Sequence, residues 1–332
     1  MPQNAKKQKL RPELEGQWWL IGPSPDVDRL VTDPISQKQR YDGMRRPEKN
    51  APVDHHIFRG PDRQWHCWGC IRATSIGRLL YHWEASSLTD SPWRSTDEFI
   101  RVDKSCGESL VDGDECIQAP FFVEHSGSYY MFYGGGSVGI MENGPAQRPR
   151  QRYQMCLMTS TDGRDWVRHK NQQGMSRVFE GPGGTRDPFV MQIDGLWHMY
   201  YCGSSEETQW QSATFLRTSP DLLNWSDHLL VHYDAEYMFA TETKKKAIEC
   251  PFVVFISGYY YLFRTVDYYS GETHVFRSED PHDFGIGDVE SRHVCRIKVG
   301  APEIYEVDGD WYVSSSHNPP LGEQLCRMRW VE

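Results

Sequence analysis

The sequence repeats a two-part pattern, and this repetition constrains the fold more than any other feature of the chain. Each copy has a short apolar segment beside a proline or a polar residue, then a turn, then a second segment rich in aromatic residues. Two short apolar segments joined by a tight turn predict a β-hairpin. A weaker copy comes first and four clear copies follow it, at residues 53–68, 118–133, 186–201, 249–263 and 301–314.

A second motif follows three of these hairpins. It reads Ser-x-Asp-x-x-x-aromatic, it begins at Ser160, Ser219 and Ser278, and its copies are evenly spaced. Ser and Asp can close a turn through their side chains, and the aromatic residue can anchor an outer strand. Antiparallel strands that recur at even spacing with such motifs are typical of β-propellers. The sequence therefore predicts an all-β fold, a five-bladed β-propeller with four antiparallel strands per blade.

The predicted domain organisation is simple. Residues 1–50 are polar and contain several prolines, so we expect an irregular N-terminal arm there. Residues 51–332 are expected to form a single five-bladed β-propeller catalytic domain, because all-β units often run this long without dividing.

Composition excludes some classes of partner. The net charge of −10 argues against nucleic acid, whose partners carry basic surfaces. No apolar run reaches the length of a membrane span, so no membrane is expected. The nine cysteines are an odd number, which excludes complete intramolecular pairing. The first residues lack the apolar core of a signal peptide, so we expect a cytoplasmic protein, or an exported one whose leader is absent from this sequence.

Polar residues at the heads of the first strands are the candidates for chemistry, because these strands line the central channel of a propeller. Carboxylates that share one funnel repel each other, so at least one of them should have a raised pKa. Glycoside hydrolysis needs this combination, a carboxylic acid that protonates the leaving oxygen and a carboxylate that acts at the anomeric carbon. The candidates, one from each blade, are Asp54, Gln118, Asp187, Glu249 and Glu303.

Three short motifs carry a resemblance to a known group of enzymes. Asp54 lies in the first repeat, Asp187 lies in Arg-Asp-Pro and Glu249 lies in Glu-Cys-Pro. This pattern resembles the glycoside hydrolase family 43 and family 32 superfamily of five-bladed propellers, over roughly residues 50–320. The Gln-Ala-Pro segment that begins at Gln118 resembles the Trp-Ala-Pro strand of family 43.

The resemblance implies roles for these residues. Asp54 would be the catalytic base or nucleophile, Asp187 would orient the substrate and tune the pKa of the acid, and Glu249 would be the general acid. His317 resembles a histidine that some family 43 enzymes place near an axial metal. We expect that the reaction requires no cofactor. The resemblance allows a structural Ca²⁺ or Na⁺ ion at the axis of the propeller. The expected contacts with an oligo- or polysaccharide substrate are Arg186, Gln118, His317, Glu303, His55 and Trp68.

Two departures from the family patterns bear on the mechanism. The Asn-Asp-Pro-Asn-Gly motif of family 32 is absent, and His55 follows Asp54 where a proline would stand. This favours family 43 and an inverting hydrolysis of a furanoside or xyloside through an activated water. The Glu-Cys-Pro motif favours the alternative, a retaining β-fructosidase. A non-catalytic carbohydrate-binding propeller is a second alternative, but the axial residues differ between blades, which favours one asymmetric site.

Overall fold

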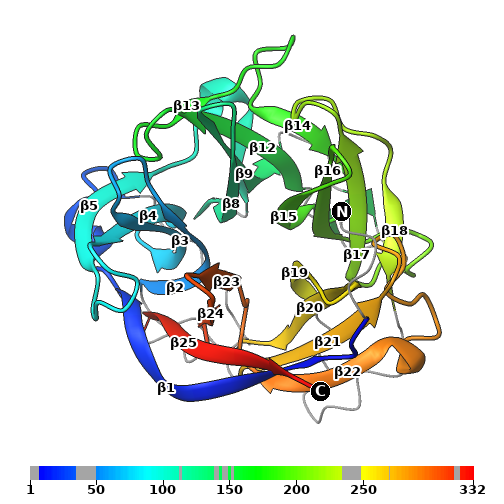
Figure 1. Cartoon of the computed structure of the whole chain (residues 1–332). Helices are drawn as coiled ribbons and strands as arrows, with labels where there is room; N and C mark the ends of the chain where they lie inside the picture. Colours follow the sequence, from blue (N-terminus) through cyan, green and yellow to red (C-terminus); the bar gives the residue numbers. More distant parts are fainter. Residues whose placement is uncertain are drawn as a thin grey trace.

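The strands of the protein are arranged as blades around a central axis in the computed structural model (Figure 1). The innermost strands are β2, β8, β15, β19 and β23, and the hairpins that they begin are the five predicted from the sequence. The fold is a five-bladed β-propeller with antiparallel blades, which confirms the predicted fold class. The structure describes residues 7–34, 50–111, 114–137, 142–143, 149–150, 153–233, 248–268, 270–317 and 322–332.

Blades I and II share one continuous sheet, because two short strands connect them. Blade I contains β2 (Ala51–Arg59), β3 (Trp65–Thr74), β4 (Gly77–Ala85) and β5 (Arg94–Ile100). The connection contains the 3₁₀ helix η2 (Lys104–Cys106), β6 (Glu108–Val111) and β7 (Asp114–Glu115). Blade II contains β8 (Ile117–His125), β9 (Ser128–Ser137), β12 (Tyr153–Ser160), β13 (Val167–Arg168) and β14 (Arg177–Glu180), and a small separate hairpin is formed by β10 (Glu142–Asn143) and β11 (Pro149–Arg150).

Blades III and IV are regular four-stranded sheets in which neighbours in the chain are neighbours in the sheet. Blade III contains β15 (Arg186–Ile193), β16 (Leu196–Gly203), β17 (Ala213–Ser219) and β18 (Leu229–His232). Blade IV contains β19 (Glu249–Ile256), β20 (Tyr259–Asp267), β21 (Glu272–Ser278) and β22 (His293–Lys298), with η3 (Glu290–Arg292) before its last strand.

Blade V joins the two ends of the chain. It contains β23 (Ile304–Val307), β24 (Asp310–Ser315) and β25 (Gly322–Val331), and its outer strand is β1 (Arg11–Pro23), which precedes η1 (Val27–Arg29). The prediction of an irregular arm over residues 1–50 was therefore wrong for β1. Its backbone pairs with the last strand, from Arg11 opposite Val331 to Pro23 opposite Gly322, and so takes the place of a fourth C-terminal strand.

The repeated Ser-x-Asp motifs form the predicted turns. Ser160 Oγ donates to Asp162 Oδ1 at 2.8 Å, and Ser219 Oγ donates to Asp221 Oδ1 at 3.1 Å. The Asp carboxylates in turn accept backbone N–H groups two and three residues further on, so each turn is closed by side chains, as Asx turns are.

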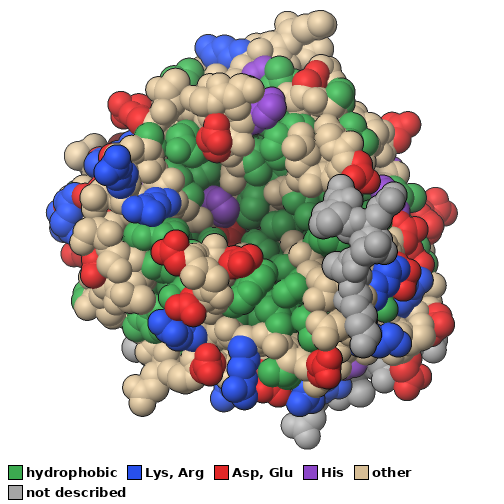
Figure 2. All heavy atoms as spheres, in the orientation of Figure 1, with side chains coloured by type: hydrophobic (Ala, Val, Ile, Leu, Met, Phe, Trp, Pro, Cys, Tyr) green, Lys and Arg blue, Asp and Glu red, His purple; other side chains and the backbone are tan. Residues whose placement is uncertain are grey.

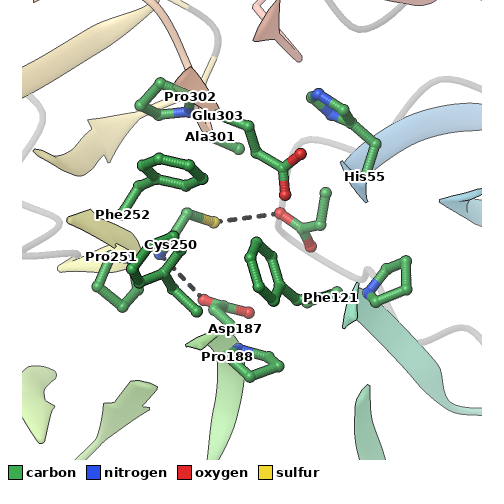
Figure 3. Close-up of a pocket in the computed structure, with 14 residues that line it drawn as sticks. His55, Phe121, Asp187, Pro188, Cys250, Pro251, Phe252, Ala301, Pro302 and Glu303 are labelled. Carbon is green, nitrogen blue, oxygen red and sulfur yellow. Dashed lines mark hydrogen bonds between the residues drawn. The ribbon is translucent and has the colours of Figure 1, made fainter. Parts of the chain in front are cut away.

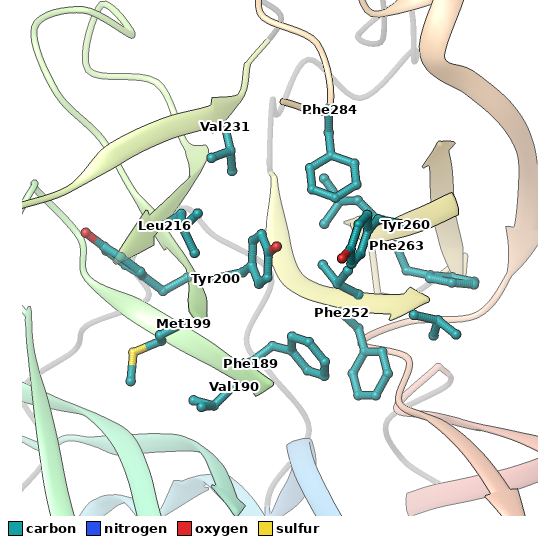
Figure 4. Close-up of a cluster of buried hydrophobic side chains, with 14 of the residues drawn as sticks. Phe189, Val190, Met199, Tyr200, Leu216, Val231, Phe252, Tyr260, Phe263 and Phe284 are labelled. Atoms are coloured by element: carbon teal, nitrogen blue, oxygen red, sulfur yellow. The ribbon is translucent and has the colours of Figure 1, made fainter. Parts of the chain in front are cut away.

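Aromatic side chains fill the spaces between blades. Figure 4 shows the packing between blades III and IV, where Phe189 and Phe252 lie with ring centroids 4.2 Å apart. Tyr200 is buried there as well, and its hydroxyl donates to the carbonyl of Pro281 at 2.9 Å. Tilted aromatic pairs of this kind stabilise a core beyond the area that they bury.

The molecular surface agrees with a ring-shaped protein. Figure 2 shows one face, which is hollowed at its centre, with hydrophobic side chains around the hollow and charged side chains mostly toward the outer edge. Over the described ranges, no helix combines the length and apolar character needed to cross a bilayer.

The inner strands share one irregularity that shapes the centre of the ring. One residue at or just before the head of each inner strand adopts a positive φ between 49° and 55°, and the strand ladder slips at this point in β2, β8, β15 and β19. Such a bulge bends a strand and redirects its side chains. The following residue is proline in four blades, where the irregular pairing tolerates a missing N–H. The bulge residues are Asp54, Ala119, Asp187 and Cys250, and the fifth residue with this φ is Ala301, which precedes β23.

Candidate active site

A pocket of about 300 Å³ lies beside the bulges of four blades. Its volume is at the lower end of the range for small-molecule sites. The three predicted catalytic carboxylates are all in its wall, although they are far apart in the sequence and come from β2, β15 and β19. Arginines and tyrosines complete the wall, whose lining residues are Val53, Asp54, Arg72, Arg78, Gln118, Tyr153, Arg186, Asp187, Glu249 and Tyr268.

Asp54 occupies the bulge of blade I and is buried. Its Oδ1 accepts two hydrogen bonds, from the Tyr268 hydroxyl at 2.6 Å and from the Cys250 thiol at 3.2 Å. Burial raises the pKa of Asp54, and the hydrogen bond from Tyr268 and the charge of Arg78 oppose this rise. Because both groups donate to the same oxygen, they fix the orientation of the carboxylate.

Asp187 occupies the bulge of blade III and is also buried. Its Oδ2 accepts the backbone N–H of Cys250 at 3.3 Å and lies 3.6 Å from Nε of Arg186. Burial raises the pKa of Asp187 to about 7, with Arg186 opposing the rise and the charges of Asp54 and Glu249 adding to it. Near neutral pH this side chain is therefore partly protonated.

Glu249 precedes the bulge of blade IV and is the most accessible of the three acids. Its side chain is 26% exposed, whereas that of Asp187 is 4% exposed. Nη2 of Arg186 donates to Oε1 of Glu249 at 2.7 Å, and Nη1 of the same arginine donates to the carbonyl of Gly184 at 3.0 Å. Arg186 thus lies between two of the three carboxylates and is held by the backbone.

We expect the substitution Asp187→Asn to stabilise the protein at alkaline pH. Because the pKa of Asp187 is raised from 3.8 to about 7, the folded state binds a proton there that the unfolded state releases. That contribution is fully present below pH 3.8 and is lost as the pH rises through 7. The variant should gain up to about 4 kcal/mol at pH 8 and little near pH 4. Thermal melts of both proteins across this range would show it, and parallel curves would contradict it.

A narrower channel continues along the axis from this pocket. Asp54 and Asp187 line both spaces, and Phe121, Phe252 and Glu303 point into the channel (Figure 3). Figure 3 also shows the contact from Cys250 to Asp187, which connects neighbouring blades. Half of the residues that line the channel are phenylalanine or proline.

The axial Ca²⁺ or Na⁺ ion stays a prediction. Ca²⁺ takes six to eight oxygen ligands, whereas the only carboxylates among the described residues that line the channel are those of Asp54, Asp187 and Glu303, so the channel fits such an ion poorly. We therefore derive no step of the reaction through a metal.

Two predicted substrate contacts, Glu303 and His55, line the axial channel and not the pocket. Glu303 Oε1 accepts a hydrogen bond from Nδ1 of His56 at 3.0 Å. His55 Nδ1 lies 2.8 Å from Oε2 of Glu323, and neither side chain is exposed. Burial lowers the pKa of His55, but the Glu323 carboxylate outweighs it and raises this pKa to about 9. An ion pair in the wall of blades I and V explains His55 better than a sugar contact does.

Trp68 was wrongly predicted to contact substrate. It is 1% exposed, its Nε1 donates to the carbonyl of Gly163 at 3.0 Å and its ring stacks on His82 with centroids 4.7 Å apart. Its side chain packs between blades I and II, since alternate residues of a strand point to opposite faces of the sheet.

His317 lies in blade V, outside the lining of the pocket and of the channel. Its Nδ1 is 2.7 Å from the Ser315 hydroxyl, and its ring meets Trp18 edge-on with centroids 4.7 Å apart. Burial lowers the pKa of His317. Its predicted contacts with substrate and with a metal are not supported by this position.

The other two predicted contacts, Gln118 and Arg186, are in the pocket. Gln118 is buried, and its Oε1 accepts a hydrogen bond from Nη1 of Arg78. The five axial candidates are not equivalent, however. Asp54 and Asp187 are bulge residues, and Gln118 and Glu249 come one position before a bulge. Glu303 comes two positions after Ala301, just before β23 begins.

Sequence reasoning missed the four polar pocket residues Arg72, Arg78, Tyr153 and Tyr268, and the thiol of Cys250. Arg72 and Arg78 flank the turn between β3 and β4, at the end of blade I where Asp54 lies. A pair of arginines around a strand turn of a buried blade is a detectable signal, because charged groups rarely lie at such positions without a partner. Tyr268 follows β20 and has no comparable signal.

The fold and the pocket together define a class of protein. A five-bladed propeller that gathers an acidic triad from three blades, with an arginine between two of the acids, is a glycoside hydrolase. Residues 104–331 match the family described as the glycosyl hydrolases family 32 N-terminal domain, and the chain belongs to this family. The sequence matches no curated protein.

Solved structures share the fold at low sequence identity. A thermostable family-43 glycoside hydrolase is 15% identical with a TM-score of 0.59, over 85% of this chain and 90% of that one. An α-L-arabinofuranosidase from Lactobacillus brevis is 11% identical with a TM-score of 0.58, over 83% and 90%. A family-32 β-fructofuranosidase from Bombyx mori, in complex with sucrose, is 15% identical with a TM-score of 0.53, over 85% and 60%.

Proposed function

We propose that this glycoside hydrolase cleaves a furanoside bond of an oligo- or polysaccharide, with Glu249 as general acid and Asp54 acting at the anomeric carbon. The observation that carries the proposal is the convergence of Asp54, Asp187 and Glu249 in one pocket. A pair of carboxyl groups flanking the scissile bond is what glycoside hydrolysis requires. The sequence motifs around the three residues support the same assignment.

The surroundings of each acid support a division of roles. Asp54 is buried and oriented by Tyr268 and Cys250, which suits a group that must approach one carbon atom. Glu249 is more exposed, which suits a group that must reach the leaving oxygen. A positioned acid of this kind contributes about 10²- to 10⁴-fold to the rate.

Asp187 and Arg186 would control the proton on Glu249. Proton donation requires Glu249 to leave its ion pair with Arg186, whose Nε is already 3.6 Å from Asp187. When the guanidinium turns toward Asp187, that carboxyl releases its proton and Glu249 can take one up. In this scheme the two acids hold one proton between them, and substrate hydroxyls that bind Arg186 favour the productive arrangement.

The stereochemical course has two candidates. Membership of family 32 and the Glu-Cys-Pro motif favour a fructofuranoside and retention, in which Asp54 attacks the anomeric carbon directly. The absence of the Asn-Asp-Pro-Asn-Gly motif favours the second candidate, inversion through a water on an arabinofuranoside or xyloside. In that case Asp54 would activate the water.

A panel of aryl and disaccharide substrates would test the proposal. Fructofuranosides, arabinofuranosides, galactofuranosides and xylosides would be supplied, and the anomer of the first product would be read by NMR within the first turnovers. We expect hydrolysis of a furanoside with a product of the same anomeric configuration as the substrate. A product of opposite configuration would select the inverting candidate. No hydrolysis of any furanoside would overturn the proposed substrate class.

A further inference from the structure

Two histidines and a glutamate meet in blade I, at the opposite end of the strands from the acidic pocket. His66 on β3 pairs directly opposite Glu84 on β4, and His82 is two residues before Glu84, so the three side chains share one face of the sheet. Both histidines are completely buried. The potential ligand atoms of the three residues all lie within 4.8 Å of one another.

The hydrogen bonds of His82 assign its proton to Nδ1. This atom lies 3.0 Å from the Thr96 hydroxyl and 3.2 Å from Oε2 of Glu98. The Thr96 hydroxyl donates its only proton to the carbonyl of His82, and therefore accepts from the ring. Since a carboxylate also accepts, Nδ1 of His82 carries the hydrogen and Nε2 carries a lone pair.

The hydrogen bonds of His66 assign its proton to Nε2. This atom lies 3.0 Å from Oδ1 of Asp62, a carboxylate oxygen that also accepts the backbone N–H of Gln64 at 2.9 Å. A neutral His66 therefore carries its lone pair on Nδ1. That atom faces Nε2 of His82 at 3.0 Å.

Two imidazole lone pairs at this distance repel each other unless a cation lies between them. We propose that a Zn²⁺ ion is this cation, bound by Nδ1 of His66, Nε2 of His82 and a carboxylate oxygen of Glu84, with water in the fourth position. Tetrahedral zinc at normal bond lengths separates two nitrogens by about 3.3 Å, so the rings need to part by only a few tenths of an ångström.

The outer partners of the histidines match those of zinc sites. Histidine ligands usually donate their second N–H to a carboxylate, which fixes the tautomer and makes the ligand more basic. Asp62 does this for His66, and Glu98 lies in the same position relative to His82. Glu84 is also paired with Arg94 and lies 3.2 Å from Arg164. Because Arg94 is largely exposed, it can turn to solvent when the ion binds.

The ion would lie in blade I, next to the contacts of this blade with blade II. Trp68 stacks on His82 and donates to the carbonyl of Gly163 in blade II, and the neighbouring Arg164 reaches Glu84 and Glu98. Phe58, which pairs with His66, is five residues along β2 from Val53 in the pocket wall, a distance of about 16 Å. The proposed ion is therefore separate from the acidic pocket and from hydrolysis.

Zinc binding to the full-length protein would test the proposal. The protein would be stripped with a chelator, and Zn²⁺ alone would be returned in competition with a chromophoric chelator while thermal melts are recorded. We expect one equivalent of tightly bound zinc and a higher melting temperature. In His82→Gln this equivalent should be lost, and Asp62→Asn, an exposed partner outside the ligand set, should weaken binding about 10- to 100-fold. His198→Gln, a buried histidine of blade III, is the matched control and should bind normally.

Each outcome is decisive, and none depends on hydrolysis. Absence of stoichiometric zinc binding by the stripped protein would overturn the proposal. The contact between His66 Nδ1 and His82 Nε2 would then be a hydrogen bond with a proton between the two nitrogens. Unchanged binding in both His82→Gln and Asp62→Asn would place the metal elsewhere and overturn it as well. Circular dichroism of the metal-free variants would establish that they are folded. If His82→Gln does not fold, the zinc affinity of Asp62→Asn still tests the proposal.

Discussion

The substitution Glu249→Gln is expected to reduce kcat on unactivated saccharides about 10²- to 10⁴-fold, because the leaving oxygen then departs without a proton. The loss should be much smaller with a dinitrophenyl glycoside, whose leaving group is stable as an anion. Gln has the shape of Glu, and the residue is partly exposed, so the fold should be retained. Steady-state kinetics on both kinds of substrate would measure the difference.

The dependence on the leaving group separates catalysis from structural damage. Glu272→Gln changes a similarly exposed carboxylate on β21, outside the pocket, and serves as the matched control. It should leave the kinetics on both substrates close to those of the parent protein. An equal loss on both substrates in Glu249→Gln would argue against Glu249 as the general acid.

The substitution Asp54→Asn is expected to have the larger effect, a loss of about 10⁴- to 10⁶-fold in kcat on every substrate. The amide can neither attack the anomeric carbon nor take a proton from water, so the quality of the leaving group cannot compensate. Tyr268 and Cys250 can still donate to the remaining carbonyl oxygen. Because burial raises the pKa of Asp54, removing its charge should not lower the melting temperature at neutral pH.

A second aspartate with a positive φ, Asp194, provides the control. Asp194, in the turn between β15 and β16, has a φ of 48° and is exposed, so Asp194→Asn makes the same change at a left-handed position. Its activity should be unchanged. Substantial activity in Asp54→Asn, beyond what contaminating parent protein explains, would remove Asp54 from the reaction.

Local pattern was enough to predict the blades. The apolar segments and the turn that predict each hairpin lie within about fifteen residues of one another. The Ser-x-Asp turns are closed by contacts between residues two or three positions apart. β1 escaped prediction because its pairing partner, β25, lies at the other end of the chain. A strand whose apolar face depends on so distant a neighbour has little local signal.

The site was predicted only in part, because local sequence motifs mark some of its residues and not others. Asp54, Asp187 and Glu249 stand beside recognisable motifs, and the ring topology brings them together. Trp68 was misplaced because its direction depends on which face of β3 meets blade II, and a one-residue change of register reverses that direction. Arg78 and Tyr268 reach the pocket from outside the repeated motifs, so their position follows from the path of the chain between strands.

The pairing of β1 with β25 also determines when the enzyme can be completed during synthesis. Arg11 is opposite Val331, so β1 must wait without its neighbour in the sheet until β25 has been synthesised. Until then blade V has a missing edge and the circle of blades is open, whereas blades III and IV can form from contiguous segments. Because Arg11 and Val331 are adjacent, a short peptide could connect β25 to β1 and new ends could be made in a surface turn, giving a permuted chain with the same architecture.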